Sequence, residues 1–130
     1  MEWVESNLTL LRGAYPKLEH RPEDSVHWVR IPSYPLPSEI WTVQAAEIAF
    51  RIPQLAGEAP YGFWVRPGLS LVSGAAIGNY SYPTTTPWGG NWGQFSFAPV
   101  GQWQPQANVQ AGANMLRFAR GIGERLQEGA

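Results

Sequence analysis

The chain contains no cysteine, and this absence excludes more chemistry than any other feature of the sequence. Disulfide bonds, thiolate nucleophiles, zinc sites with cysteine ligands and iron–sulfur clusters all require that side chain. Charge is also scarce, since charged residues make up 15% of the chain, whereas about a quarter is usual. The formal net charge of −1 excludes the strongly basic footprint of a nucleic-acid-binding protein and the polybasic patch of a membrane-surface protein.

Long apolar runs are absent as well. No stretch reaches the roughly eighteen apolar residues of a transmembrane helix, and residues 1–5 are acidic where a signal peptide would be basic and then apolar. We therefore expect a cytoplasmic protein.

What the chain does have is 44% hydrophobic residues and seven tryptophans, enough to build a core. Its 130 residues predict a single domain over residues 1–130.

The titratable groups are distributed unevenly. Residues 59–123 contain no Asp, Glu, His, Lys or Cys, although they hold four of the seven tryptophans and many Asn, Gln, Ser and Thr residues. General acid–base catalysis near neutral pH needs a group that titrates in that range. A tryptophan-rich surface with neutral polar groups suits recognition better. This half of the chain therefore favours a binding protein over an enzyme.

Apolar periodicity predicts a helix near each end of the chain. Residues 3–12 place apolar side chains on one helical face, and Gly13 is expected to end this first helix. A second helix is predicted over residues 109–127, with Asn108 as its N-cap. Glycines inside that range weaken the helix, which indicates close packing on a sheet or an early end.

Short β-rich runs separate the two helices. Strands are predicted over residues 14–22, 26–31, 40–52, 61–65 and 94–99. Residues 44–47 favour a helix by propensity, but the alternation at Ile48, Phe50 and Ile52 favours a strand. Residues 73–93 are predicted to form one long aromatic loop. The predicted fold is α+β, with an N-terminal helix, an antiparallel meander of about four strands, the long loop and a C-terminal helix.

Three short motifs follow one another in the second half of the chain. Thr86-Pro87-Trp88 comes first, Ser96 stands nine positions after Pro87, and Trp103-Gln104-Pro105 begins seven positions after Ser96. Together with the order of elements, they resemble the His-Pro-Asn flap, the catalytic cysteine and the Trp-Ser-Pro element of the ubiquitin-conjugating-enzyme (UBC) fold, in its divergent prokaryotic branch. Residues 28–41 are also similar to bacterial members of that fold found beside ubiquitin-like proteins.

The departures from the family pattern bear on function. Ser96 stands where the family has its nucleophile, Trp88 replaces the flap asparagine that supports the oxyanion, and Thr86 replaces the histidine. A serine hydroxyl needs a base to activate it, and none is nearby in the sequence. The resemblance therefore implies a non-catalytic, RWD-like variant. It would be an active conjugating enzyme only if Ser96 replaced a native cysteine.

The resemblance also implies partners. We expect a protein–protein interaction subunit that binds a ubiquitin-like protein, an activating enzyme or a conjugating enzyme of the same pathway as a hetero-oligomer, without nucleic acid or membrane. The predicted binding residues are Trp88, Asn91, Trp92, Phe95 and Trp103, and Ser96 with the flap Thr86, Pro87 and Trp88 marks a degenerate active-site position.

Plainer interpretations of these residues stay open. Ser96 is equally explained as a strand residue that faces solvent. Trp88 and Trp92 fit either exposed anchors of a partner site or caps over a small core of the loop itself. Trp103 fits a position packed in the core.

No cofactor or metal is predicted. His20 and His27 flank acidic residues, but their spacing matches no metal motif, and the chain has no phosphate-binding or dinucleotide-binding fingerprint. The alternative function is a carbohydrate- or small-ligand-binding β-rich module with stacked tryptophans. A third hypothesis is an enzyme that uses Ser96 or a tyrosine with groups from the charged N-terminal half.

Overall fold

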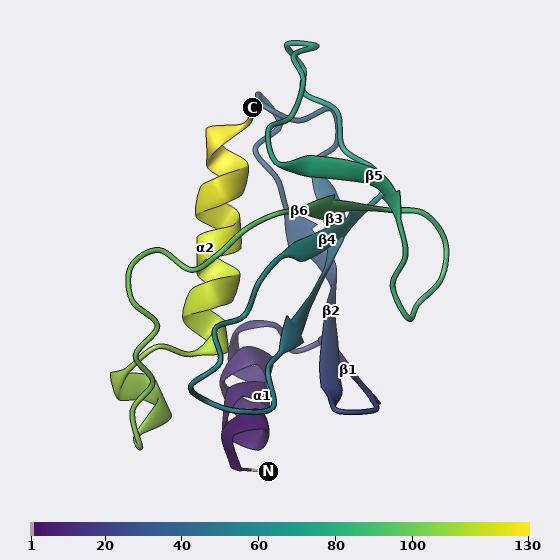
Figure 1. The fold of residues 1–130 in the computed structure, drawn as a ribbon. Helices are drawn as coiled ribbons and strands as arrows, with labels where there is room; N and C mark the ends of the chain where they lie inside the picture. The colour runs from purple at the N-terminus through teal and green to yellow at the C-terminus, as the bar shows by residue number, and fades with distance from the viewer. Residues whose placement is uncertain (1) are drawn as a thin grey trace.

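A sheet covered on one face by two helices makes up the computed structural model, which describes residues 2–130 (Figure 1). The six strands are all antiparallel and lie in the order β1-β2-β3-β4-β6-β5. The elements are α1 (Glu2–Ala14), β1 (Glu19–Glu23), β2 (Val26–Pro35), β3 (Ala45–Ile52), β4 (Phe63–Arg66), β5 (Tyr80–Thr84), β6 (Trp92–Phe95), the 3-10 helix η1 (Val109–Ala111) and α2 (Met115–Glu128).

Strand β3 shows why the sheet has two different faces. Successive side chains of a strand point to opposite faces. Ile48, Phe50 and Ile52 belong to the core shared with the helices and are completely buried, whereas Glu47 and Arg51 alternate with them and are only partly buried. Complete burial of a large apolar side chain contributes about 1.5–3 kcal/mol. The face toward the helices, which we call the helical face, therefore holds most of the folding energy.

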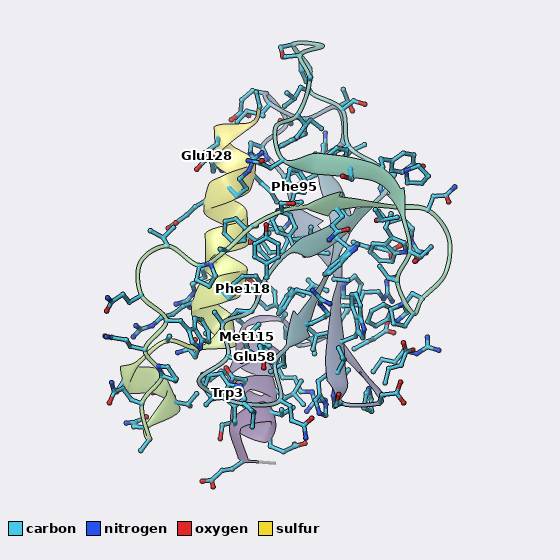
Figure 2. All side chains as sticks on the ribbon, in the orientation of Figure 1. Trp3, Glu58, Phe95, Met115, Phe118 and Glu128 are labelled. Atoms are coloured by element: carbon cyan, nitrogen blue, oxygen red, sulfur yellow. The ribbon has the colours of Figure 1, made fainter. Side chains whose placement is uncertain are left out.

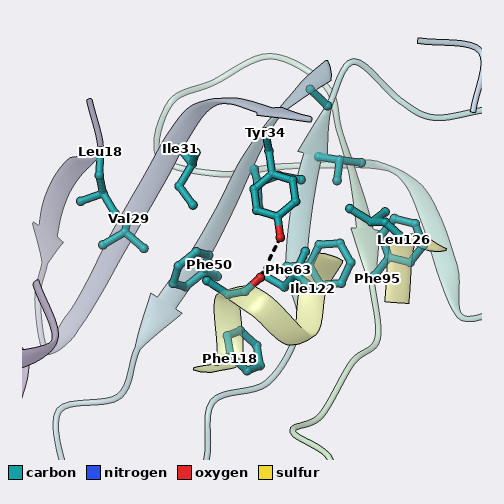
Figure 3. Close-up of a cluster of buried hydrophobic side chains, with 14 of the residues drawn as sticks. Leu18, Val29, Ile31, Tyr34, Phe50, Phe63, Phe95, Phe118, Ile122 and Leu126 are labelled. Atoms are coloured by element: carbon teal, nitrogen blue, oxygen red, sulfur yellow. Dashed lines mark hydrogen bonds between the residues drawn. The ribbon is translucent and has the colours of Figure 1, made fainter. Parts of the chain in front are cut away.

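Helix α2 packs closely along the helical face. Its Phe118, Ala119 and Ile122 are buried against the sheet (Figure 3). The hydroxyl of Tyr34 donates a hydrogen bond of 2.9 Å to the carbonyl of Ala119, drawn as a dashed line in Figure 3. Gly123 permits this approach, because a Cβ atom there would lie 2.8 Å from the Tyr34 hydroxyl. The close packing predicted from the glycines of this helix is thus confirmed.

Helix α1 is joined to α2 by a buried amide. The Oδ1 atom of Asn7 accepts a hydrogen bond of 2.7 Å from the backbone N–H of Met115, the first residue of α2. The Nδ2 atom of Asn7 donates to the carbonyl of Trp3 at 2.8 Å. The first N–H groups of a helix lack partners within it. Asn7 therefore satisfies one of them from a different helix and fixes how the two helices meet.

The predicted single helix over residues 109–127 is wrong in one respect. Asn108 caps η1 as predicted, but the chain then leaves helical geometry, and α2 begins after a cap of its own, Asn114. The break falls at Gly112, whose backbone is extended and lies against the carbonyl of Gln104. A Cβ atom at Gly112 would approach that carbonyl to 2.6 Å. A contact with a distant segment, rather than local propensity, therefore divides the helix.

The predicted aromatic loop over residues 73–93 also needs correction, because it contains β5 and the start of β6. Proline normally argues against a strand, since it cannot donate to the ladder. Pro83 is tolerated in β5 because that strand lies at the edge of the sheet. The α+β class with a helix at each end is confirmed, and the meander of about four strands is part of a sheet of six.

The other predicted strands are confirmed with shifted bounds. The strand predicted over 40–52 begins at Ala45, so the helical alternative for residues 44–47 is wrong. The strand predicted over 26–31 continues through Pro35. The predictions over 14–22, 61–65 and 94–99 correspond to β1, β4 and β6.

Candidate functional site

Strand β6 separates the two parts of the predicted site. The loop of residues 85–91, which carries Thr86, Pro87 and Trp88, precedes β6, whereas Ser96 directly follows its last residue. At the ordinary rise of a strand, the Cα atoms of Trp92 and Ser96 lie about 13 Å apart. Figure 1 shows the loop on the side of the sheet away from α2, while the chain beyond β6 passes over α2. The predicted flap and Ser96 therefore lie at opposite ends of one strand.

Ser96 is exposed and its backbone is held on both sides. Its N–H donates to the carbonyl of Asn79 at 2.8 Å, and the next carbonyl, that of Phe97, accepts from the N–H of Gly62 at 2.7 Å. Within residues 2–130, the Ser96 hydroxyl makes no hydrogen bond. The groups that hold this position are an asparagine carbonyl, a glycine and a phenylalanine, none of which can take a proton from it.

A groove of about 470 Å³ lies beyond Ser96, between the segment after β6 and α2. Phe97 and Trp103 line it from that segment, and Arg117 and Arg120 line it from α2. The Phe97 ring also meets Phe118 of the core, with centroids 5.6 Å apart. Glu124 of α2 lines it as well, so the groove combines an aromatic lining with two guanidinium groups and one carboxylate.

Trp103 belongs both to this groove and to the core. Its indole N–H donates to the carbonyl of Ala56 at 2.8 Å, and its ring meets that of Trp3 edge-to-face, with centroids 6.2 Å apart. The residue is half-buried and packs against the core cluster. Because its position is fixed from two sides, Trp103 can present a rigid surface to a ligand at low entropic cost.

The sheet face away from the helices, the outer face, carries an aromatic cluster that the sequence did not predict as a unit. We call Trp28, Trp64, Trp88 and Trp92 the outer aromatic cluster. The ring of Trp28 lies 4.8 Å from that of Trp64 and 6.3 Å from that of Trp88. Trp64 and Trp92 are buried, and Trp28 and Trp88 are partly exposed. Strand alternation is the sequence signal that could have placed Trp28 and Trp64 on one face.

The loop of residues 85–91 folds back onto this cluster. The indole N–H of Trp92 and the Nη1 atom of Arg66 both donate to the carbonyl of Gly89, at 2.7 and 2.9 Å. The Arg66 guanidinium also lies over the Trp92 ring, 4.4 Å from its centroid. This packing corresponds to the interpretation in which Trp88 and Trp92 cap a small core of the loop.

Carboxylates and guanidiniums form a second network on the outer face. Glu47 accepts from Arg30 at 2.9 Å and from Arg66 at 2.7 Å, and Arg30 also pairs with Glu19. Burial lowers the pKa of Arg30, but the hydrogen bonds and charges of Glu19 and Glu47 outweigh it and raise that pKa. Glu47 thus links β2 to β4 through their arginines and indirectly holds the loop.

Arg51 stands apart from that network. Its guanidinium lies over two tryptophan rings, 4.9 Å from the centroid of Trp64 and 5.6 Å from that of Trp28. Its Nη2 atom donates to the carbonyl of Tyr61 at 3.3 Å. Burial between these groups lowers the pKa of Arg51. The sequence analysis did not single out this residue, because its surroundings come from other strands.

Two of the predicted binding residues are not accessible. Phe95 is completely buried and stacks on Phe63 with centroids 4.7 Å apart, and Figure 2 shows it in the layer between the sheet and α2. Trp92 is also completely buried. Neither side chain is accessible in this structure, because Phe95 faces the core and the loop covers Trp92, while their part in a binding surface stays a prediction. Asn91 is exposed on the loop.

The two histidines form a pair rather than a metal centre. His20 Nε2 and His27 Nδ1 lie 3.1 Å apart, at hydrogen-bonding distance, on the β1–β2 hairpin. Across residues 2–130, no group of three His, Cys, Asp or Glu side chains could hold a metal ion.

A sheet of this order, with α1 and α2 on one face and a loop-rich segment between β6 and α2, is consistent with the UBC fold and defines the class of the protein. The model of the family described as Prokaryotic E2 family E matches residues 5–120. The chain belongs to this family. It contains Ser96 but no cysteine. Neither curated proteins nor solved structures gave a match. No helix of the described part is long and apolar enough to cross a membrane.

Proposed function

We propose that the chain is a non-catalytic E2-like interaction subunit of a bacterial ubiquitin-like protein conjugation pathway. Its partner would be the ubiquitin-like protein, the activating enzyme or an active conjugating enzyme, in a hetero-oligomer. Family membership supports the pathway. The observation that carries the non-catalytic role is the state of Ser96, whose exposed hydroxyl has no hydrogen-bond partner within residues 2–130 and which the motif resemblance assigns to the position of the family's nucleophile.

The chemistry of transfer supports this role. A conjugating enzyme carries its cargo as a thioester, and a serine hydroxyl becomes nucleophilic only when a neighbouring base removes its proton. Around Ser96 the backbone hydrogen bonds come from Asn79 and Gly62, and residues 59–123 contain no His, Asp, Glu or Lys. The flap residues Thr86 and Trp88 lie at the other end of β6, where they cannot supply an oxyanion donor.

The surfaces beside this position suit binding. The groove lined by Phe97, Trp103, Arg117 and Arg120 offers aromatic area together with two cations. Tryptophan and arginine are the side chains most enriched at the energetic centres of protein interfaces. The groove lies beside the segment that follows Ser96, and binding there needs no reactive side chain.

The test is to supply the missing nucleophile. The Ser96→Cys variant is mixed with the activating enzyme, the ubiquitin-like protein and ATP, and we expect no band that disappears on reduction. A matched control is Ser81→Cys, which places a thiol on exposed β5. Because the natural chain has no cysteine, any reducible adduct reports the introduced thiol alone. A thioester on Ser96→Cys but not on Ser81→Cys would show a working active site and refute the non-catalytic role.

A binding measurement completes the test. The unmodified chain is mixed separately with the ubiquitin-like protein, the activating enzyme and the conjugating enzyme, and complexes are detected by size-exclusion chromatography with calorimetry. We expect one of the three to bind, and binding to weaken in Trp103→Ala. If none binds, the interaction role is wrong even if no thioester forms.

The carbohydrate hypothesis receives little support from the outer aromatic cluster. Stacking on a sugar requires an exposed, flat ring face. Trp64 and Trp92 are buried, and Trp88 meets Trp28 at an interplanar angle of 83°, so these rings form no open platform. We expect oligosaccharides to leave the tryptophan emission unchanged.

A further inference from the structure

Arg51 is a partly buried arginine of the outer face whose charge has no carboxylate partner within residues 2–130. Arg30 and Arg66 share Glu47, and Arg30 also pairs with Glu19. The Nε and Nη1 atoms of Arg51 make no hydrogen bond within the same residues. The Arg51 guanidinium is thus able to bind an external anion.

The position of this guanidinium is already fixed. Arg51 contacts the rings of Trp28 and Trp64 and donates through Nη2 to the carbonyl of Tyr61. Binding an anion would therefore cost less side-chain entropy than at a free surface arginine. The fork of a guanidinium matches the two oxygens of a carboxylate, and charge-assisted hydrogen bonds of this kind are the strong ones.

A cavity of about 480 Å³ opens beside Arg51 and has largely apolar walls. Pro53, Leu55 and Tyr61 line it, and Leu55 and Tyr61 are 67% and 53% exposed. The only carboxylate among its lining residues is Glu58, which is exposed and forms no ion pair with Arg51. A ligand that fills this cavity must therefore combine an acidic group with apolar surface.

We propose that this Arg51 cavity binds a segment of a partner protein in which a carboxylate side chain is flanked by apolar side chains. The carboxylate pairs with the Arg51 guanidinium, and the flanking side chains pack on Leu55 and Tyr61. The inference rests on the proposed interaction role and specifies the chemistry of the partner. It concerns a different surface from the groove beside Ser96, so either site can fail without the other.

Nucleic acid and a simple anion fit the cavity less well. A phosphate backbone is bound by several cations in a row, and here Arg30 and Arg66 are neutralised by Glu19 and Glu47, which leaves Arg21 on β1 as the other unpaired arginine of the face within residues 2–130. A free anion would satisfy Arg51 but leave the exposed apolar walls in water. An acidic, apolar-flanked peptide satisfies both.

The experiment uses a short capped peptide of alternating leucine and aspartate as the probe. Binding to the full chain is followed by calorimetry and by the NMR signals of the Trp28 and Trp64 indole N–H groups. We expect saturable, salt-sensitive binding that shifts both signals. The Arg51→Gln variant should bind at least about tenfold more weakly. The matched control Arg12→Gln, which removes an exposed arginine on α1, should bind as the natural chain does.

Further arms separate the outcomes. Arg51→Lys keeps the charge without the fork and should give intermediate affinity. The melting curve of Arg51→Gln shows whether that variant is still folded when its binding is weaker. The same peptide with asparagine in place of aspartate should not bind, and inorganic phosphate should not displace the acidic peptide at equal concentration. Equal binding of the asparagine peptide, displacement by phosphate, unchanged affinity in Arg51→Gln, or no binding at millimolar peptide would each overturn the proposal.

Discussion

The two faces of the sheet are built from alternate residues of the same strands, yet they are stabilised in different ways. On the helical face, Ile48 and Phe50 are completely buried under α1 and α2. On the outer face, the intervening residues Glu47 and Arg51 are only partly buried and contact charged and aromatic side chains. The helical face is thus closed by α1 and α2, whereas the outer face is covered over Trp64 and Trp92 and stays partly exposed at Glu47 and Arg51.

The energies of the two kinds of contact differ accordingly. Burial of a large apolar side chain is worth about 1.5–3 kcal/mol, and truncation inside a packed core costs more because a cavity remains. A cation–π contact contributes about 0.5–2 kcal/mol, and an exposed ion pair about 0–1 kcal/mol. The helical face therefore sets the stability of the fold, which leaves the outer face free to change with function.

The largest effect is expected on the helical face. Phe50 is completely buried and its ring meets Phe118 edge-to-face, with centroids 5.8 Å apart. Phe50→Ala should lower the free energy of unfolding by about 3–5 kcal/mol in urea denaturation. The control is Tyr61→Ala on the outer side, which is 53% exposed and should change it by no more than about 0.5 kcal/mol. Comparable losses in the two variants would remove the distinction between the faces.

An intermediate effect is expected from the ion-pair network of the outer face. Glu47→Gln removes both charge-assisted pairs, to Arg30 and to Arg66, and leaves two partly buried guanidiniums underpaired. We expect a loss of about 1–2 kcal/mol after solvent screening. The emission of Trp92 should change too, because Arg66 holds the loop against that ring.

The matched control for this variant is Glu19→Gln. Glu19 pairs with Arg30 alone and its side chain is 47% exposed, so the loss should stay below about 1 kcal/mol and tryptophan emission should not change. If Glu47→Gln were as mild as Glu19→Gln, the network would be a surface feature without influence on the loop.

The parts of the fold that the sequence predicts correctly are those specified by local pattern. The first helix is visible because Val4, Leu8 and Leu11 recur at helical spacing, and all three are buried. Strand β3 is visible because apolar residues alternate up to Ile52. Both patterns reflect the period of one element on one buried face, so no information from elsewhere in the chain is needed.

The parts that it misses depend on partners distant in sequence. The break at Gly112 arises from a contact with the carbonyl of Gln104. Strand β5 contains a proline and forms because it pairs with β6 at the edge of the sheet. The outer aromatic cluster depends on register, since Trp28 lies opposite Arg51 in the adjacent strand. Register across strands cannot be obtained from spacing within one strand.

The same limit explains the outcome for the candidate site. Phe95 and Ser96 are adjacent in sequence, but Phe95 is buried in the core and Ser96 is exposed. A motif comparison places a window of residues at a site without saying which of them faces the core. Which side chains face the core depends on how they alternate along β6, and this strand has only four residues to define the alternation.

The smallest effect is expected where the helical face reaches solvent, at His20. Burial, the neighbouring His27 and Arg12 of α1 all lower the pKa of His20 below its ordinary 6.5, and Glu5 opposes them only in part. The unfolded chain therefore binds a proton on His20 more readily than the folded chain does. As the pH falls through 6.5 toward the lowered pKa, the free energy of unfolding should decrease. Above 6.5 His20 is neutral in both the folded and the unfolded chain, so it causes no loss of stability there.

Melting curves of the natural chain and of His20→Gln between about pH 7.5 and about pH 5, above the range where most carboxylates titrate, check this prediction. The natural chain should lose melting temperature over this interval, because a proton on His20 places a positive charge in a partly buried position beside His27 and near Arg12. The His20→Gln variant cannot take up that proton, so its curve should be flatter, whatever its stability at neutral pH. Equal slopes in the two proteins would mean that His20 titrates alike in the folded and unfolded chains. The stability of the helical face would then not depend on the protonation of His20.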